Sequence, residues 1–177
     1  MTIKELFNYV IPGARTTLGY AERLLKDIPP ELSARKPVVN GKMIECNHPV
    51  FLFGHLSLYP QLVSELLELP KDGAVKVPES YPGLFQIGSP CLDDLSGTIY
   101  PPLAEVSERF FSGMNAILER VPSVSQEKMD MILENPSRRE RFGTYGAFIT
   151  YVLLAHPQTH LGQLSSWRRC VGLGAAN

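Results

Sequence analysis

Apolar residues recur at every third or fourth position along most of this chain, which is the spacing of amphipathic helices rather than strands. The first run starts after Thr2 and ends at the proline pair 29–30. Thr2 and Glu5 have the spacing of a capping box, which predicts a helix start there. Because a proline inside a helix lacks the N–H donor and crowds the preceding turn, Pro12 predicts a kink or a break after Val10.

A second helix is predicted from about Pro49 to Leu69, since proline suits the first turn and Asn47 or His48 then lies at the cap. Gly54 in this run would let a neighbouring helix approach closely. Pro60 should bend the helix one turn beyond His55.

Two irregular segments separate the predicted helices. Residues 31–45 form a loop with a turn at Asn40-Gly41. Residues 69–99 form a long loop rich in proline and glycine, which is uncommon inside a compact domain unless it is functional or disordered. Leu84, Phe85 and Ile87 suggest that it folds back as a lid or wall for a pocket.

The second half of the chain contains two more long helical runs. One starts near the prolines 101–102 and ends at Pro122, and the other extends from about Thr144 to Val171. A short extra helix, 126–133, lies between them and is followed by a turn at Asn135-Pro136. These elements predict an all-α fold, a four-helix bundle forming a single domain over residues 1–177.

Composition and charge narrow the function classes. The 17 basic and 18 acidic side chains leave a net charge of -1 with no basic run, which argues against nucleic acid or an anionic membrane as a partner. We identify no signal peptide and no run of about 18 apolar residues, so no membrane span is expected. The three cysteines are scattered, as is typical of reduced thiols in a cytoplasmic protein.

Three of the four histidines form a candidate metal site. His156 and His160 are four residues apart, so they share one helix face, which is otherwise largely apolar. His55 is central on the apolar face of the second predicted helix. A ring buried in a core needs a hydrogen bond or a metal ion. Two readings therefore stay open: a three-histidine metal site, or core histidines bonded to the backbone or to Tyr59 and Gln163.

Two residues bear on this site without belonging to it. His48 precedes Pro49 at a helix entrance, so a capping or surface role is favoured over metal binding. Pro157 would remove one helical hydrogen bond and bend the segment between the two late histidines. The bend must leave both rings aimed at one point for the site to exist.

Three neutral imidazoles leave a metal ion with an open coordination position, as in catalytic rather than closed structural sites. Imidazole suits several metals, and we expect Zn or Ni, with Fe or Mn also open. No carboxylate lies on the His156 and His160 face, so no catalytic residue is assigned. Tyr59 and Gln163 are candidates to orient the rings, beside an ordinary packing role.

Two sequence stretches resemble the DinB/YfiT-like superfamily. The run 156–164 followed by Arg168-Arg169 is similar to the family's closing H-x-x-x-H and Gly-Gln signature, and the run 47–56 is similar to its second-helix motif, which ends in Gly-His-Leu. The resemblance spans nearly the whole chain, although Pro157 departs from the usual pattern. It implies an up-down-down-up four-helix bundle, a homodimer, and a divalent metal held by His55, His156 and His160.

For function, the resemblance implies a metal-dependent enzyme of hydrolase or thiol-transferase type that acts on a small molecule or a low-molecular-weight thiol. The alternative is a non-enzymatic bundle that the metal braces, with a stress-related or interaction role. Neither reading involves nucleic acid or a membrane.

Overall fold

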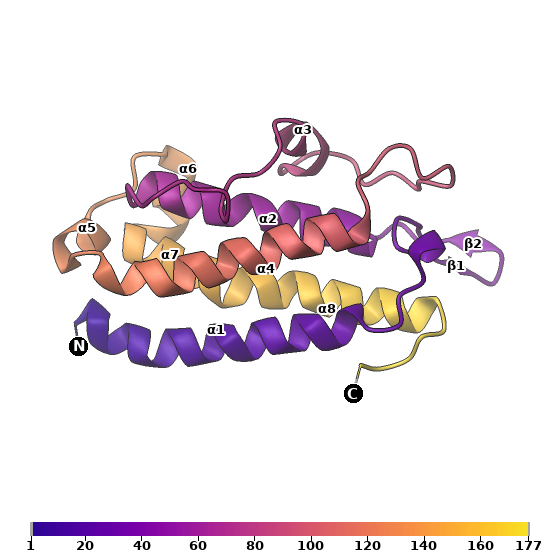
Figure 1. Cartoon of the computed structure of the whole chain (residues 1–177), viewed down its shortest axis with the longest axis horizontal. Helices are drawn as coiled ribbons and strands as arrows, with labels where there is room; N and C mark the ends of the chain where they lie inside the picture. Colours follow the sequence, from indigo (N-terminus) through magenta and orange to yellow (C-terminus); the bar gives the residue numbers. More distant parts are fainter. Residues whose placement is uncertain (1, 177) are drawn as a thin grey trace.

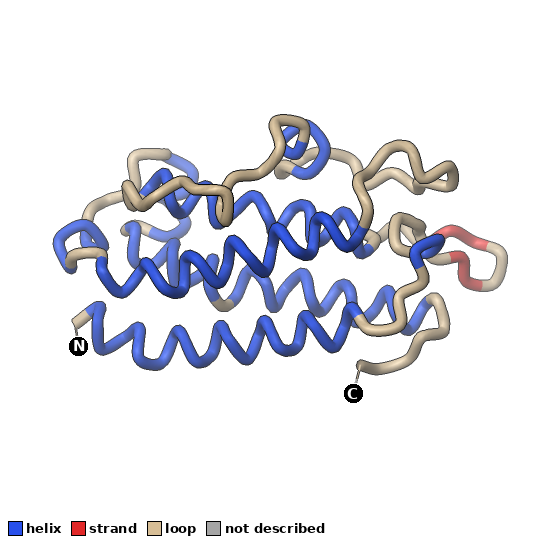
Figure 2. The backbone as a smooth tube through the Cα atoms, viewed as in Figure 1, coloured by secondary structure: helices blue, strands red, loops and turns tan. Residues whose placement is uncertain are grey.

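The computed structural model describes residues 2–176, and this part of the chain is mostly helical, as the all-α prediction requires. Long helices α1 (Ile3–Leu25), α2 (Pro49–Leu66), α4 (Leu103–Arg120) and α8 (Ala155–Cys170) lie side by side (Figure 1; Figure 2). Shorter elements connect them: 3-10 helices η1 (Pro30–Leu32) and η2 (Val121–Ser123), and helices α3 (Tyr81–Phe85), α5 (Gln126–Asp130), α6 (Pro136–Phe142) and α7 (Tyr145–Leu153). No described helix is both long enough and apolar enough to cross a bilayer.

The predicted start of α1 is confirmed, and of the two outcomes predicted at Pro12, a kink or a break after Val10, the break does not occur. Thr2 and Glu5 form both hydrogen bonds of the capping box. The helix continues through Pro12 without interruption. Pro12 is exposed, so the carbonyl that loses its partner faces water, while Val10 and Ala14 remain buried on the opposite face.

Helix α2 begins at Pro49 with His48 as its cap, as the sequence predicts, but ends at Leu66 instead of Leu69. Glu68 adopts a φ of 57°, a left-handed conformation that does not continue a helix. Pro60 lies inside the helix and packs against Gly113 of α4. A Cβ atom at Gly113 would lie 2.7 Å from the Pro60 ring, so glycine lets α2 and α4 approach closely.

The predicted fourth helix, 144–171, is in fact two helices. Helix α7 ends at Leu153, and α8 begins at Ala155 after Leu154, whose φ of -118° and ψ of -71° depart from helical values. Proline at 157 cannot donate to the carbonyl of Leu153, which explains an interruption just before it. Pro157 therefore lies in the first turn of α8, where a missing N–H costs little.

The connecting segments hold more structure than predicted. Residues 31–45 include η1 and a two-stranded antiparallel hairpin, β1 (Val38–Val39) with β2 (Lys42–Met43). The predicted Asn40-Gly41 turn joins these strands, with positive φ at both residues. The long 69–99 loop contains α3, and the predicted turn at Asn135-Pro136 instead starts α6.

Candidate metal centre

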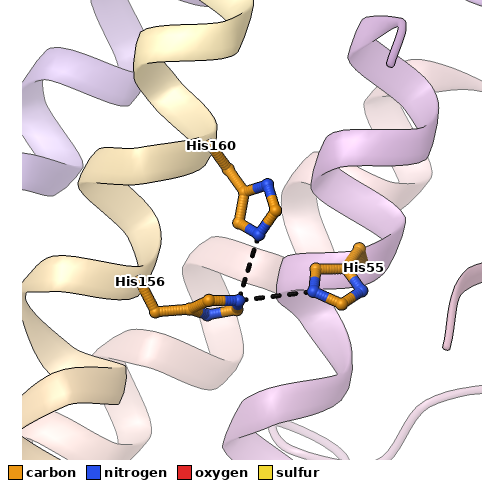
Figure 3. Close-up of side chains that lie close together, drawn as sticks. All are labelled: His55, His156 and His160. Atoms are coloured by element: carbon orange, nitrogen blue, oxygen red, sulfur yellow. Dashed lines mark hydrogen bonds between the residues drawn. The ribbon is translucent and has the colours of Figure 1, made fainter. Parts of the chain in front are cut away.

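The three histidines singled out in the sequence meet between α2 and α8 (Figure 3). His55 projects from the middle of α2, and His156 and His160 project from the first two turns of α8. The Nε2 atom of His156 lies 3.3 Å from His55 Nε2 and 3.1 Å from His160 Nε2. Their ligand atoms all lie within 4.8 Å of one another, so this group could hold a metal ion.

Hydrogen bonds on the far side of two rings orient their lone pairs toward this point. The Nδ1 atom of His55 lies 2.8 Å from the carbonyl oxygen of Phe85, and His160 Nδ1 lies 3.2 Å from Gln163 Oε1. Both partners are acceptors, so each Nδ1 carries the proton and donates it. In a neutral imidazole the other nitrogen, Nε2, then carries a lone pair, which is the form that binds metal.

Hydrogen bonds alone do not satisfy both ring nitrogens of His156. Its Nε2 faces two lone pairs, and a single N–H can be donated to one of them. Its buried Nδ1 has no hydrogen-bond partner among the described residues. Bonds of about 2.0–2.1 Å at tetrahedral angles would separate the ligand nitrogens by about 3.3 Å, close to the two spacings that involve His156. The residues therefore fit a divalent ion, which would take up the converging Nε2 lone pairs that a single N–H cannot satisfy.

Burial also holds the rings in the uncharged form. Removal from water lowers the pKa of His55 below its usual value. Burial, followed by repulsion from the neighbouring imidazoles, lowers the pKa of His156 to about 3 and that of His160 to about 4. At neutral pH all three therefore offer lone pairs without first losing a proton.

A cavity of about 450 Å³ opens beside the histidines. Residues 86–89 of the long loop contribute to its wall, so the loop does fold back beside a pocket. Of the three apolar residues that suggested this, Ile87 lines the cavity, whereas Leu84 and Phe85 do not, and Phe85 is buried in the core. Further lining comes from α6, α7 and the start of α8. The side chains from those helices are Ser137, Arg138, Arg141, Phe142, Phe148, Tyr151, His156, Thr159 and His160.

Gln163 and Tyr59, the two candidates for orienting the rings, play different parts. Gln163 accepts from His160 and also from the amide of Asn47, at 3.4 Å, so of its two candidate roles it has the one that orients a ring. Tyr59 packs its ring 4.1 Å from the His156 ring centroid and 5.3 Å from that of His55. No hydrogen bond joins Tyr59 to a histidine in the described part of the chain, so its contact is packing.

His48 does not join the three other histidines, and its predicted capping role is confirmed. Its Nδ1 accepts from the backbone N–H of Phe51, at 3.2 Å, and its Nε2 donates to the carbonyl of Leu92, at 3.0 Å. Both ring nitrogens are thus satisfied, although the side chain is fully buried.

Sequence reasoning missed two features of the site. The carbonyl of Phe85 orients His55, but a backbone acceptor leaves no side-chain pattern to detect. Arg138 and Arg141 line the cavity from α6, where the sequence predicts only a turn at Asn135-Pro136. The sequence does carry a signal for the start of that helix, because Asn135 is its cap and Pro136 its first residue.

Comparison with protein-family models, curated proteins and solved structures gives no match to this chain. The DinB/YfiT-like resemblance therefore stays a prediction. The case for metal binding depends on the geometry of the three histidines.

Proposed function

We propose that this chain is a DinB/YfiT-like divalent-metal protein that acts as an enzyme on a small molecule, by hydrolysis or by thiol transfer. The observation that carries the proposal is the convergence of three histidine Nε2 atoms beside an open cavity. Three neutral ligands leave at least one coordination position for a substrate, which a closed structural site would not.

The chain's own residues bind and orient in this scheme. His55, His156 and His160 hold the ion, which we expect to be Zn or Ni. The Phe85 carbonyl and Gln163 keep two of the rings in the ligating tautomer. When bound, the ion supplies Lewis acidity that favours deprotonation of water or of a thiol.

The proposal extends to the architecture that the resemblance implies. The four long helical segments, with α7 and α8 counted together, would form an up-down-down-up bundle that pairs as a cytoplasmic homodimer. Sedimentation of the purified protein tests the pairing directly, because a monomer at micromolar concentration would contradict it.

The enzyme proposal is tested on protein purified without a histidine tag, since a tag itself binds nickel. Elemental analysis should find about one divalent ion per chain. A panel of thiols and activated esters should show turnover that chelator removes and re-added metal restores. His55→Ala should abolish both metal content and turnover, whereas His48→Asn, which alters a histidine outside the site, should retain them.

The same experiment decides between the enzyme and a metal-braced bundle. If metal removal lowers only the melting temperature and no substrate turns over, the non-enzymatic alternative holds. If neither purified nor metal-soaked protein binds a divalent ion, both readings fail.

A further inference from the structure

The cavity beside the three histidines carries positive charge that no acidic group offsets. Arg138 and Arg141 of α6 line it, and none of its described lining residues is an aspartate or a glutamate. Neither guanidinium forms an ion pair within the described part of the chain. A chain with net charge -1 thus has a local excess of positive charge at this cavity.

Aromatic rings hold both guanidinium groups in place. Arg138 lies over the Phe148 ring, 5.5 Å from its centroid. Arg141 lies 5.0 Å from the centroids of both Phe142 and Tyr151. Stacking on the flat faces leaves the N–H edges of a guanidinium free to donate. Arg138 is half-buried and Arg141 is exposed, and these ring contacts orient the donors of both side chains.

The ring that Arg141 contacts also lies beside the histidine end of the cavity. The Tyr151 ring, 5.0 Å from the Arg141 guanidinium, has its centroid 5.5 Å from that of His156. Both arginines and all three histidines line the same cavity. An anion held by the arginines would therefore share this cavity with the proposed metal ligands.

We propose that the cavity binds a small organic anion whose carboxylate or phosphate is held by Arg138 and Arg141 while another part of the molecule reaches the three histidines. Guanidinium edges match the paired oxygens of both groups. The walls formed by Phe51, Leu52 and Phe142 suit an apolar body, and about 450 Å³ suits a small molecule. This inference rests on the proposed function for its substrate role, but the anion subsite can be tested separately.

The test compares phenylacetate with its neutral isostere phenylacetamide by calorimetry, on chelator-treated protein and on protein loaded with Zn²⁺. Elemental analysis of the loaded sample reports on the metal centre independently. The variant Arg138→Gln/Arg141→Gln removes both charges. Arg139→Gln is the matched control because Arg139 is exposed on the same helix and does not line the cavity.

We expect wild-type protein to bind phenylacetate about tenfold or more tightly than phenylacetamide, because only the carboxylate forms hydrogen bonds between two charged groups with the arginines. The preference should disappear in the double variant and persist in Arg139→Gln. Equal affinities in wild type, no phenylacetate binding in either sample, or an unchanged preference in the double variant would overturn the anion subsite. Failure to take up Zn²⁺ with the preference intact would instead contradict the proposed function alone.

Discussion

At the residue scale, the metal-facing lone pairs of His55 and His160 depend on the acceptor that each Nδ1–H finds on the far side of its ring. His55 donates to a backbone carbonyl that is anchored by the buried Phe85 ring, whereas His160 donates to a side chain, Gln163. The first acceptor is rigid, since it belongs to a packed short helix. The second can be removed by one substitution, so Gln163 is the more informative position to change.

Gln163→Leu should weaken metal binding about 10–100-fold, because the His160 ring loses the partner that fixes its tautomer. Competition with a chelating dye measures this affinity. Gln158→Leu is a suitable control because Gln158 lies on the same helix but donates to Thr17 of α1, at 2.8 Å. Equal losses in both variants would mean that the Gln163 hydrogen bond does not orient the ligand.

Gly54 is a second residue at which a small change should reach the site. A Cβ atom there would lie 2.5 Å from the Phe85 ring, so Gly54→Ala must displace Phe85 and with it the acceptor of His55. We expect a loss of about 1–3 kcal/mol in the free energy of unfolding from overpacking, together with weaker metal binding. Denaturant titration and the dye assay measure the two effects.

Gly162→Ala is the same substitution at a position without crowding, and we expect the opposite change in stability. Nothing lies within 4 Å of a Cβ atom at Gly162 of α8, so alanine should stabilise the helix by up to about 1 kcal/mol. Destabilisation at both positions would show that close packing against Phe85 is not the cause at Gly54.

At the element scale, the end of α1 is held by a residue from the far end of the chain. Arg168 of α8 is buried and donates to the carbonyls of Leu24, at 2.9 Å, and Lys26, at 2.6 Å. The last carbonyls of a helix have no partner within it, so this arginine caps α1 and ties it to α8. Arg168, one of the two arginines near the C-terminal end of α8, therefore has a structural role.

Arg168→Met should lower the free energy of unfolding by about 2 kcal/mol, since the buried carbonyl of Leu24 and the partly buried carbonyl of Lys26 lose a charged donor. Thermal unfolding should shift down by roughly 4–8 °C for a chain of this size. Arg169→Met is the control, because Arg169 is exposed and its hydrogen bonds reach only Ser165 on its own helix. A similar shift in both variants would exclude a specific cap.

Local signals explain which elements the sequence could predict. The cap and first-turn proline of α2 were readable, and His55, His156 and His160 could be placed on apolar helix faces. The start of α6 carries the same kind of signal, but its charged residues have no apolar stripe that separates a helix from a turn. The position of α6 over the cavity depends on tertiary packing, so the arginine pair could not be inferred.

At the scale of the whole molecule, stability should depend on pH through His48. Burial lowers its pKa to about 4 although Asp93 and Asp94 raise it, with Lys36 adding to the lowering. Because the unfolded pKa is about 6.5, the folded protein binds fewer protons between these values. The contribution of His48 to the free energy of unfolding is fully present above about pH 6.5. It is lost as the pH falls toward 4, by on the order of 3 kcal/mol.

His48→Asn isolates that contribution, since asparagine can keep the cap of α2 but does not titrate. Denaturant unfolding of metal-free protein between pH 4 and 7 should show a shallower loss of stability in the variant than in wild type. Parallel curves would mean that His48 is protonated as easily in the folded state as in the unfolded one.

A metal ion at the three histidines would join α2 to α8 across 101 residues of sequence, from His55 to His156, so binding should stabilise the whole fold. An ion that binds only folded protein adds about 2.7 kcal/mol at a free concentration of 100 times its dissociation constant. Melting temperature measured with Zn²⁺ and then with excess chelator should therefore differ in wild type. His160→Ala removes a half-buried ligand, so its melting temperature should respond little to the ion. An equal rise in the variant would place the ion elsewhere, and no rise in wild type would contradict the site.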